Sequence, residues 1–359
     1  MPLPLSPVRR TDALIVGGGP AGAAAAITLA RAGRMPLLLE RRREPAGTVC
    51  GGFVGWDALE ALRHLGIDVA ALGAHPIGKV RIVAGRRSVV ARLPHRAAGL
   101  SRRTLDAALL RAAREAGAEV EQGVAVREIV GDRARLADGR ELTGAPLIVA
   151  TGKHAIRGVP REGAWRGAVG LRTTIPAPAN LHGAIELHLF RGGYAGLLRQ
   201  EDGRANLCLS VSAARLAEAG GTADALIGAV AHEAPKLAER AQAVDEPWVS
   251  IAGVPYGWRA TQPGPWRVGD QAAVIASVVG DGIAIARASG RAAGEALLTG
   301  DSADGYQRRF ARRARRPLAI AEAARRLAER PASLGVLFPL LRHMPVALTL
   351  AARLTRIGT

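Results

Sequence analysis

The chain has 359 residues, of which 48% are apolar, and a formal net charge of +18. This length fits one large or two medium domains, and the apolar content excludes global disorder and predicts a substantial core. Aromatic residues make up only 3%, so smaller apolar side chains must fill the interior. The two cysteines lie far apart in sequence, which argues against a disulfide framework or a cysteine-based zinc site and fits a reducing compartment.

The basic charge is concentrated near the end of the sequence. Residues 306–359 contain twelve arginines and two glutamates, a net charge of +10, against +8 for the first 305 residues. Nucleic acid is not expected as a partner, because no binding motif is present and few aromatics are available for stacking. No apolar run reaches about eighteen residues and the first residues lack a signal-peptide core, so we expect a cytoplasmic protein without a spanning helix.

The first forty residues predict a βαβ unit. Residues 12–16 are typical of a buried strand, residues 23–32 of a helix, and residues 35–39 of a second strand that ends at Glu40. Between the first strand and the helix lies a G-x-G-x-x-G motif, made of Gly17, Gly18, Gly19, Pro20, Ala21 and Gly22. Such a loop lets the backbone and the helix N-terminus approach a pyrophosphate, while the terminal acid accepts hydrogen bonds from a ribose hydroxyl. The unit therefore predicts a dinucleotide site.

Several further elements follow up to residue 150. We expect a helix over residues 57–65 and a second over residues 102–116, with Ser101 as its N-cap. We expect strands at residues 79–83, 88–91 and 147–150, loose alternation over residues 119–130, and a hairpin at residues 133–140 with its turn at Asp138-Gly139.

From residue 160 the pattern changes to strands joined by short turns. We expect strands at residues 169–175, 185–190, 195–198 and 206–211, then helical structure over 213–240 with a break near 220–221. A strand and loop at 266–270 precede a helix at 282–298, and residues 306–359 are expected to be helical with breaks at Pro317, Pro331 and Pro345.

Three more glycine-containing stretches are candidates for ligand contact. Cys50-Gly51-Gly52 forms a second glycine-rich loop, and Gly269-Asp270 places a carboxylate at a strand end. Gly280-Asp281-Gly282-Ile283 precedes a helix, so its free N–H groups and the positive end of the helix dipole can face a ligand carbonyl. Taken alone, Gly269-Asp270 could be an ordinary turn, and the first glycine loop does not by itself distinguish NAD from FAD.

These motifs, in this order, resemble the geranylgeranyl reductase and aromatic-hydroxylase superfamily, which has the p-hydroxybenzoate-hydroxylase fold. The resemblance covers about 300 residues and includes Arg102 in an R-x-x-L-D helix start and Thr151-Gly152 after a strand. It implies an α/β fold: a Rossmann-like FAD-binding domain with an inserted antiparallel-sheet substrate domain and a C-terminal helical tail. The FAD-binding parts would be residues 1–75, 99–158 and 266–305, the substrate parts 76–98 and 159–265, and the basic tail 306–359.

The resemblance also implies roles for individual residues. Arg102 would reach the FAD phosphates or ribityl chain, and Val126 would contact the adenine through its backbone. The other cofactor-binding residues implied are Gly17, Gly18, Gly19, Pro20, Ala21, Gly22, Glu40, Arg41, Cys50, Gly51, Gly52, Gly269, Asp270, Gly282 and Ile283. Core packing for Val126 and a solvated first-turn arginine for Arg102 remain alternatives, and Cys50 is interpreted as a structural residue beside the flavin rather than a nucleophile.

The implied activity is an FAD-dependent oxidoreductase acting on an apolar, lipid-like substrate such as a prenyl or polyketide molecule. Reduction or dehydrogenation of C=C bonds is favoured over hydroxylation, because hydroxylases of this superfamily carry an aspartate where this chain has Thr151. The alternatives are an NAD(P)H- and O2-dependent monooxygenase and a non-catalytic flavin-binding protein. No second G-x-G-x-x-G follows a strand, which argues against a separate NADPH-binding domain. NAD(P)H could bind transiently as the reductant, or electrons could come from another protein.

No catalytic residue can be named from the sequence. The eight histidines show no metal-binding spacing, so we expect no metal site. Tyr194 and Tyr256 could line a pocket over the flavin, with core packing as the favoured interpretation. The basic tail could dock at an anionic membrane surface, receive an acidic carrier protein, or form a helical cap with solvated arginines.

Overall fold

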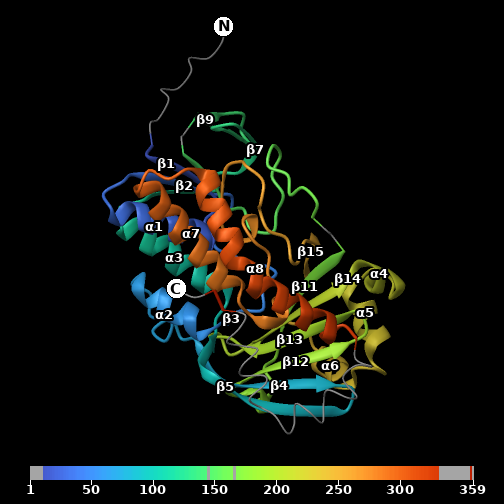
Figure 1. Ribbon diagram of the computed structural model, residues 1–359. Helices are drawn as coiled ribbons and strands as arrows, with labels where there is room; N and C mark the ends of the chain where they lie inside the picture. Colours follow the sequence, from blue (N-terminus) through green and yellow to red (C-terminus); the bar gives the residue numbers. More distant parts are fainter. Residues whose placement is uncertain (1–10, 144–145, 165–166, 331–355, 358–359) are drawn as a thin grey trace.

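Five parallel strands form the first sheet of the computed structural model, which describes residues 11–143, 146–164, 167–330 and 356–357 (Figure 1). In spatial order they are β16 (Trp266–Arg267), β10 (Leu147–Val149), β1 (Ala13–Val16), β2 (Pro36–Glu40) and β6 (Glu119–Gln122). Because all five run the same way, their carboxyl ends meet at one edge of the sheet, where doubly wound folds bind their ligands.

Helices cover one face of this sheet. Ala13 and Ile15 of β1 belong to the main core together with the buried sides of α1 (Pro20–Arg31), α3 (Arg102–Glu115) and α7 (Gly282–Leu298). α7 packs against α1 at very short range, since a Cβ atom at Gly290 would lie 2.1 Å from the carbonyl oxygen of Ala21. The alanine- and glycine-rich composition of both helices permits this approach.

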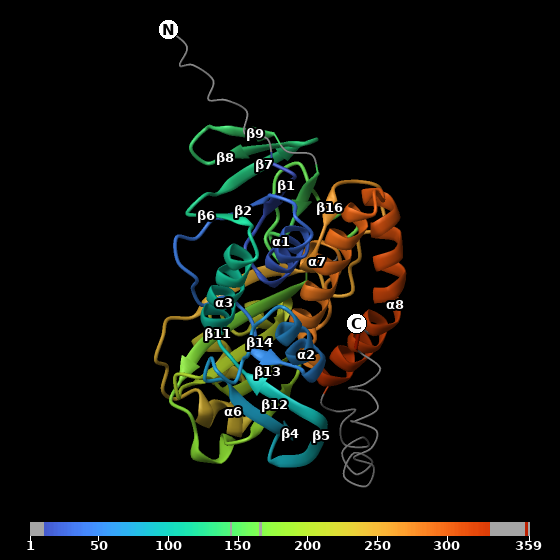
Figure 2. The ribbon, with the colours of Figure 1, turned by 90° about the vertical axis from the view of Figure 1, so that its left-hand side faces the viewer.

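A small sheet covers the opposite face. Leu14 and Val16 of β1 pack against β7 (Val126–Val130), β8 (Arg133–Leu136) and β9 (Glu141–Thr143), which lie above the parallel sheet in Figure 2. Alternate side chains of β1 therefore pack into the helical layer and against the small sheet, as expected for a strand that is buried on both faces. The hairpin predicted at residues 133–140 is confirmed, with the Arg140 N–H donating to Asp138 Oδ1 at 3.0 Å in the turn.

The second part of the molecule is built on a sheet of eight strands. Its members, in spatial order, are β15 (Val249–Val254), β11 (Ala168–Ile175), β14 (Ala205–Ser212), β13 (Gly193–Arg199), β12 (Ala184–Phe190), β4 (His75–Ala84), β5 (Arg87–Gly99) and β3 (Phe53–Val54). The sheet was expected to be antiparallel, and it is so except between β12 and β4, which run parallel. β4 and β5 belong to an earlier segment of the chain, and β4 adds to the sheet beside β12.

The two faces of the large sheet have different cover. One face packs against α5 (Ala223–Val230) and α6 (Pro235–Arg240), which follow α4 (Ala213–Glu218). The break predicted within residues 213–240 is confirmed, since Gly220 and Gly221 both have positive φ angles. The other face of the sheet is turned toward the parallel-sheet part of the molecule and lines a cavity described below.

A long helix, α8 (Ala303–Ala328), runs from the helical layer to the large sheet (Figures 1 and 2). The predicted break at Pro317 is wrong, because α8 continues through it. Pro317 is buried, and the buried positions recur along the helix on both sides of it, so packing outweighs the single lost hydrogen bond. Pro331 and Pro345 lie outside the described residues.

Short elements complete the described chain. They are α2 (Trp56–His64) and three 3-10 turns, η1 (Ala179–Leu181), η2 (Gly269–Gln271) and η3 (Ser277–Val279). Among the described residues, no helix is both long and apolar enough to cross a bilayer.

Candidate functional site: two joined cavities

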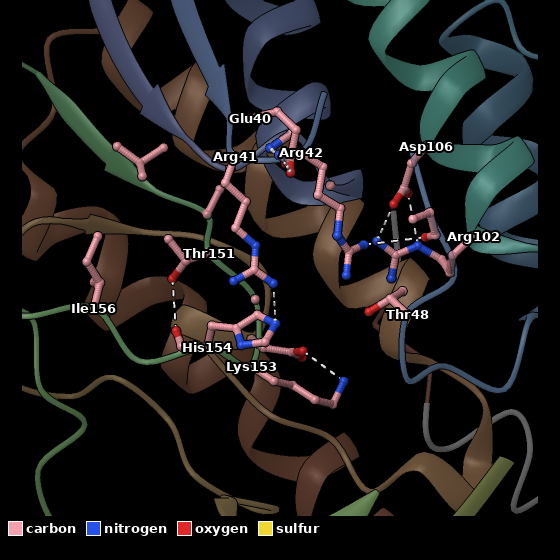
Figure 3. A pocket seen from close by; sticks show the side chains of 18 of the residues that line it. Glu40, Arg41, Arg42, Thr48, Arg102, Asp106, Thr151, Lys153, His154 and Ile156 are labelled. Atoms are coloured by element: carbon pink, nitrogen blue, oxygen red, sulfur yellow. Dashed lines mark hydrogen bonds and ion pairs between the residues drawn. The ribbon is translucent and has the colours of Figure 1, made fainter. Parts of the chain in front are cut away.

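A cavity of about 260 Å³ lies at the carboxyl ends of the parallel strands (Figure 3). Its wall includes the glycine loop after β1, the end of β2 at Glu40, and the loop 150–156 after β10. Most of the functional groups here are backbone amides and charged side chains. Such an edge of a parallel sheet is where a nucleotide is expected to bind.

Close backbone contacts require glycine at two positions of the first loop, Gly17 and Gly22. Gly17 has a φ of 113°, and a Cβ atom there would lie 2.4 Å from the carbonyl oxygen of Ala150. A Cβ atom at Gly22 would lie 1.9 Å from the carbonyl oxygen of Gly17, so Gly22 sits beneath the loop and does not line the cavity. Gly19 has only the Arg102 guanidinium nearby, at 3.3 Å, and its backbone therefore faces the cavity.

Glu40 ties the loop to the second strand. Its Oε2 accepts from the Gly18 N–H at 2.8 Å and its Oε1 accepts from the Arg42 N–H at 3.0 Å. Arg41 reaches across the cavity to His154, with 2.8 Å between Nη2 and Nε2 (Figure 3). Val126 lines the same cavity and is half-buried. The carboxylate, guanidinium and apolar side chain thus surround one space, which is large enough to take part of a ligand.

Arg102 lies at the start of α3 and lines both this cavity and a second one. Ser101 caps the helix as expected, with its hydroxyl accepting from the Thr104 N–H at 3.1 Å. The guanidinium is held by a two-point pair with Asp106, at 2.9 and 2.8 Å. Burial opposes the charge on Arg102, but Asp106 and Cys50 outweigh it and raise its pKa. The arginine is therefore positioned as a permanent cation between the two cavities.

The second cavity has a volume of about 480 Å³ and lies between the two parts of the molecule. Leu187, Leu189 and Ile82 from the large sheet, and Ile320 and Leu327 from α8, contribute apolar side chains to its wall. It shares a wall with the first cavity, formed by Gly19, Val49, Arg102, Ala150, Gly152, Lys153, Ile251 and Asp270. An elongated ligand can therefore run from one cavity into the other.

Asp270 in η2 forms an ion pair with Lys153, with 3.0 Å between Oδ2 and Nζ. Burial alone would lower the pKa of Lys153, and Asp270, Tyr256 and Cys50 outweigh it, so the pKa is raised and the ammonium stays charged. The neighbouring Gln271 holds the loop 151–154 in place by donating to Thr151 Oγ1 at 2.6 Å and to the His154 carbonyl at 2.8 Å. The Thr151 hydroxyl is therefore engaged in a hydrogen bond with the Gln271 side chain.

The Cys50-Gly51-Gly52 loop crosses the larger cavity. Asn206 on β14 donates to the carbonyl oxygens of Cys50 and Gly51 at 3.1 and 2.9 Å. No neighbouring atom lies within 4 Å of a Cβ position at Gly51, so its backbone faces open space. Burial raises the pKa of Cys208, on the same wall, to about 12, which keeps this thiol protonated at neutral pH.

The N-terminus of α7 closes the end of the larger cavity. Gly282 has open space at its Cβ position, and Ile283 lines the wall beside it. The buried Asp281 carboxylate pairs with Arg356, which also pairs with Asp57 at 3.0 Å and lies over the Trp56 ring, 3.9 Å from its centroid. A segment near the end of the chain therefore meets the start of α7.

Several of these residues were not expected from the sequence. Lys153 and Gln271 have partners that are distant in the sequence, and no short motif marks them. Asp106 ends the R-x-x-L-D motif, but its role as the ion-pair partner of Arg102 was not predicted. Arg356 lies in the arginine-rich stretch, where it cannot be distinguished from its neighbours by spacing. Ser277 lies three residues before the Gly280 motif, and this proximity was the only available signal.

The residues present fit a dinucleotide that spans both cavities. A glycine loop with exposed backbone, Glu40 in the smaller cavity, and Arg102 and Asp270 at the junction match the parts of such a molecule. No group of three or more potential metal ligands occurs among the described residues.

Comparisons with known proteins agree with this interpretation. Residues 10–142 match the family model described as FAD binding domain. The chain is 27% identical over 332 residues to a menaquinone reductase of Mycolicibacterium smegmatis, covering 82% of this chain and 78% of that protein. The fold is similar to that of the flavin-dependent brominase Bmp2, with a TM-score of 0.80, 17% identity, and coverage of 97% and 93%. PqsL, a probable FAD-dependent monooxygenase from Pseudomonas aeruginosa, gives a TM-score of 0.70 at 17% identity, with coverage of 92% and 100%.

The chain is an FAD-dependent oxidoreductase. Its fold is similar to that of the flavoproteins Bmp2 and PqsL, and FAD is its cofactor. The match of residues 10–142 covers the glycine loop, Glu40, the Cys50 loop and Arg102.

Proposed function

We propose that the protein reduces C=C bonds in an apolar, lipid-like substrate, with FAD extending through both cavities. The smaller cavity would hold the adenosine and pyrophosphate, and the larger one the flavin and the substrate. The observation that carries this proposal is the direct junction between a polar cavity and a larger, mainly apolar one.

The assignment of residues follows the path of the cofactor. The glycine loop would receive the pyrophosphate together with Arg102, and Glu40 would accept from the adenosine ribose. Asp270, oriented by Lys153, would accept from the ribityl hydroxyls. The first turn of α7 would place its free N–H groups and positive dipole end beside the flavin carbonyl edge, which stabilises negative charge there. FAD itself supplies hydride transfer when bound.

The remaining task of the protein is to shape the substrate space. Leu187, Leu189 and Leu327 exclude water, and no acid–base pair is needed for binding a hydrocarbon chain. The similarity to a menaquinone reductase supports a prenylated lipid as substrate. NAD(P)H is our proposed source of electrons. We propose that it binds transiently, since no second G-x-G-x-x-G follows a strand in the sequence.

The second candidate is an NAD(P)H- and O2-dependent monooxygenase. The fold similarity to a probable FAD-dependent monooxygenase favours it. Against it stands Thr151, which occupies the place of the hydroxylase aspartate and is engaged by Gln271 at 2.6 Å.

Oxygen dependence separates the two candidates. Purified, FAD-loaded protein would be reduced chemically without oxygen and mixed with prenylated naphthoquinones and prenyl alcohols, and the products analysed by mass spectrometry. The reductase predicts flavin reoxidation in the absence of oxygen and a product that, after its ring is reoxidised to the quinone, still carries two added hydrogens in the prenyl chain. Product that forms only in air, with one added oxygen atom, would instead establish the monooxygenase.

We also propose that the outer face of α8 docks on an anionic membrane surface. This basic face consists of six exposed arginines, Arg308, Arg309, Arg312, Arg313, Arg315 and Arg316. Farther along the same helix, Leu327 is 44% exposed and lines the larger cavity, as does the exposed Arg92 of β5. A membrane-dissolved substrate could enter at this rim without crossing water.

Vesicle sedimentation tests the membrane proposal. Replacing both Arg312 and Arg316 by Gln should weaken binding to anionic vesicles by roughly 30-fold, since each cation near such a surface contributes about 1 kcal/mol. The control replaces Arg111 and Arg114, two exposed arginines of α3, and should bind as the wild type does. Equal binding of all three proteins, or capture by an acidic carrier protein but not by vesicles, would refute the membrane proposal.

A further inference from the structure

Three hydroxyl groups from separate segments meet at the wall of the larger cavity. Tyr194 lies on β13, Ser277 begins η3, and Tyr256 follows β15. The two tyrosine oxygens lie 2.6 and 2.9 Å from Ser277 Oγ. Both tyrosines are buried, whereas Ser277 is exposed and lines the cavity. We call these three residues the hydroxyl cluster.

The hydroxyl cluster carries one more proton than its internal hydrogen bonds use. Three hydroxyls carry three protons, and the two hydrogen bonds between them use two. The third proton lies outside these two bonds: Tyr194 has Ser210 and Tyr256 as further neighbours, and Ser277 faces the cavity, where a ligand can accept from the cluster. Because the Ser277 hydroxyl is exposed to a mainly apolar cavity, a ligand that brings an acceptor gains a hydrogen bond there, worth about 0.5–1.5 kcal/mol.

The charges around the cavity indicate which acceptor fits. Three cations of its wall already have carboxylate partners: Arg102 with Asp106, Lys153 with Asp270, and Arg356 with Asp281. A further one, Arg92, is exposed at the rim. An anionic ligand group beside the hydroxyl cluster would therefore meet no free buried cation among the described residues. A neutral oxygen fits better.

The protonation state of the tyrosines agrees with a donor role. Burial, reinforced by Tyr256, raises the pKa of Tyr194 well above its ordinary value. Its hydroxyl therefore stays protonated at neutral pH and can donate, directly or through Ser277.

We infer that the hydroxyl cluster binds a carbonyl oxygen on an otherwise apolar substrate, such as the ring oxygen of a quinone. This inference rests on the proposed function, because it names the polar group of the same substrate. The hydroxyl cluster would anchor the carbonyl-bearing end, and the apolar wall formed by Leu187 and Leu189 would receive the hydrocarbon part.

A matched pair of ligands tests the inference on the FAD-loaded protein. The probes are a methylated naphthoquinone and the corresponding methylnaphthalene, which differ in the carbonyl oxygens, and binding is followed by perturbation of the flavin absorbance. The variants are Ser277→Ala, Tyr194→Phe and Tyr256→Phe. Each should weaken quinone binding by roughly threefold to tenfold, the range expected for one neutral hydrogen bond, and leave naphthalene binding unchanged.

Controls separate binding from folding and from turnover. Tyr306→Phe removes a buried hydroxyl that bonds the Arg267 and Ser289 carbonyls and does not line either cavity, so the quinone-to-naphthalene affinity ratio should stay at the wild-type value. FAD occupancy and melting temperature report on the integrity of each variant. If all three cluster variants keep the wild-type affinity ratio, the inference is wrong, even if C=C reduction occurs. If the ratio falls as expected but no reduction occurs, the carbonyl site stands and the proposed reaction fails.

Discussion

The two cavities are built by different means. The smaller one is built largely from short loops that follow parallel strands, namely the glycine loop, the segment from Glu40 and the loop after β10, with Arg102 and Asp270 added from other segments. The larger one is made from side chains of two sheets, η3 and α8, which are far apart in sequence. Short local motifs therefore mark much of the smaller cavity, whereas the larger cavity depends on how distant segments pack. Substitutions in the two regions should therefore have different effects: loss of FAD affinity at the smaller cavity and loss of stability at the larger one.

The largest effect is expected from Gly22→Val. Its Cβ atom would lie 1.9 Å from the Gly17 carbonyl oxygen, so the loop must move. We expect FAD affinity to fall by at least on the order of 100-fold, equivalent to about 2.7 kcal/mol, as measured by flavin fluorescence titration. Gly228→Ala is the control, because no atom lies within 4 Å of that Cβ position, and it should bind FAD normally. Full FAD occupancy in the valine variant would contradict the assigned role of the loop.

At the larger cavity, Arg356→Met should affect stability. Asp281 is 0% exposed and would lose its ion pair, and an unpaired buried charge typically costs about 3–5 kcal/mol. The measurement is the free energy of unfolding from denaturant titration, with Arg316→Met on the exposed face of α8 as a control that should change it by less than about 0.5 kcal/mol. Equal stability of the two variants would show that the contact with Asp281 is not formed in solution.

Outside the cavities, the large sheet should carry an acid-sensitive ion cluster. Glu186 on β12 contacts His188 at 3.1 Å and Arg240 at 3.3 Å. Burial opposes its charge, but His188 and Arg240 outweigh it and lower the pKa of Glu186 to about 2 from 4.5. Because the folded-state pKa is depressed, the stabilisation is complete above pH 4.5 and is lost as pH falls toward 2.

Glu186→Gln should therefore reduce stability at neutral pH by roughly 1–3 kcal/mol and flatten the stability profile between these pH values. Unfolding titrations across acid pH measure this. Glu60→Gln, at an exposed ion pair of α2, is the matched control and should retain the wild-type slope. If Glu186→Gln keeps the wild-type pH dependence of the free energy of unfolding, that dependence must come from other carboxylates.

The same contrast explains what could be predicted from the sequence. The βαβ unit, the hairpin at residues 133–140 and the helix capped by Ser101 were predicted because local patterns specify them. β15 was not predicted, because its residues Val249–Val254 are largely exposed and pair with a strand about eighty residues earlier. The continuation of α8 through Pro317 was missed because tertiary packing outweighs the local rule.

The residues of the candidate site also fall into two groups, those that a short motif marks and those that only the folded structure brings together. Gly19, Glu40 and Asp270 were found from motifs that keep a fixed spacing. Lys153 could not be found, because its partner Asp270 is 117 residues away along the chain. Ser277 was missed because its partners Tyr194 and Tyr256 lie 83 and 21 residues away and no fixed spacing links the three. Tyr194 and Tyr256 were interpreted as core residues, and they are indeed buried, but both also line the larger cavity.

The central claim is that one FAD molecule runs through both cavities. A crystal structure of the FAD-loaded protein tests it most directly. We expect the adenosine beside Glu40 and Val126, the pyrophosphate at Gly19 and Arg102, and the isoalloxazine ring in the larger cavity between the Cys50 loop and the start of α7. An isoalloxazine ring in the smaller cavity, or a cofactor bound elsewhere with the larger cavity empty, would contradict it.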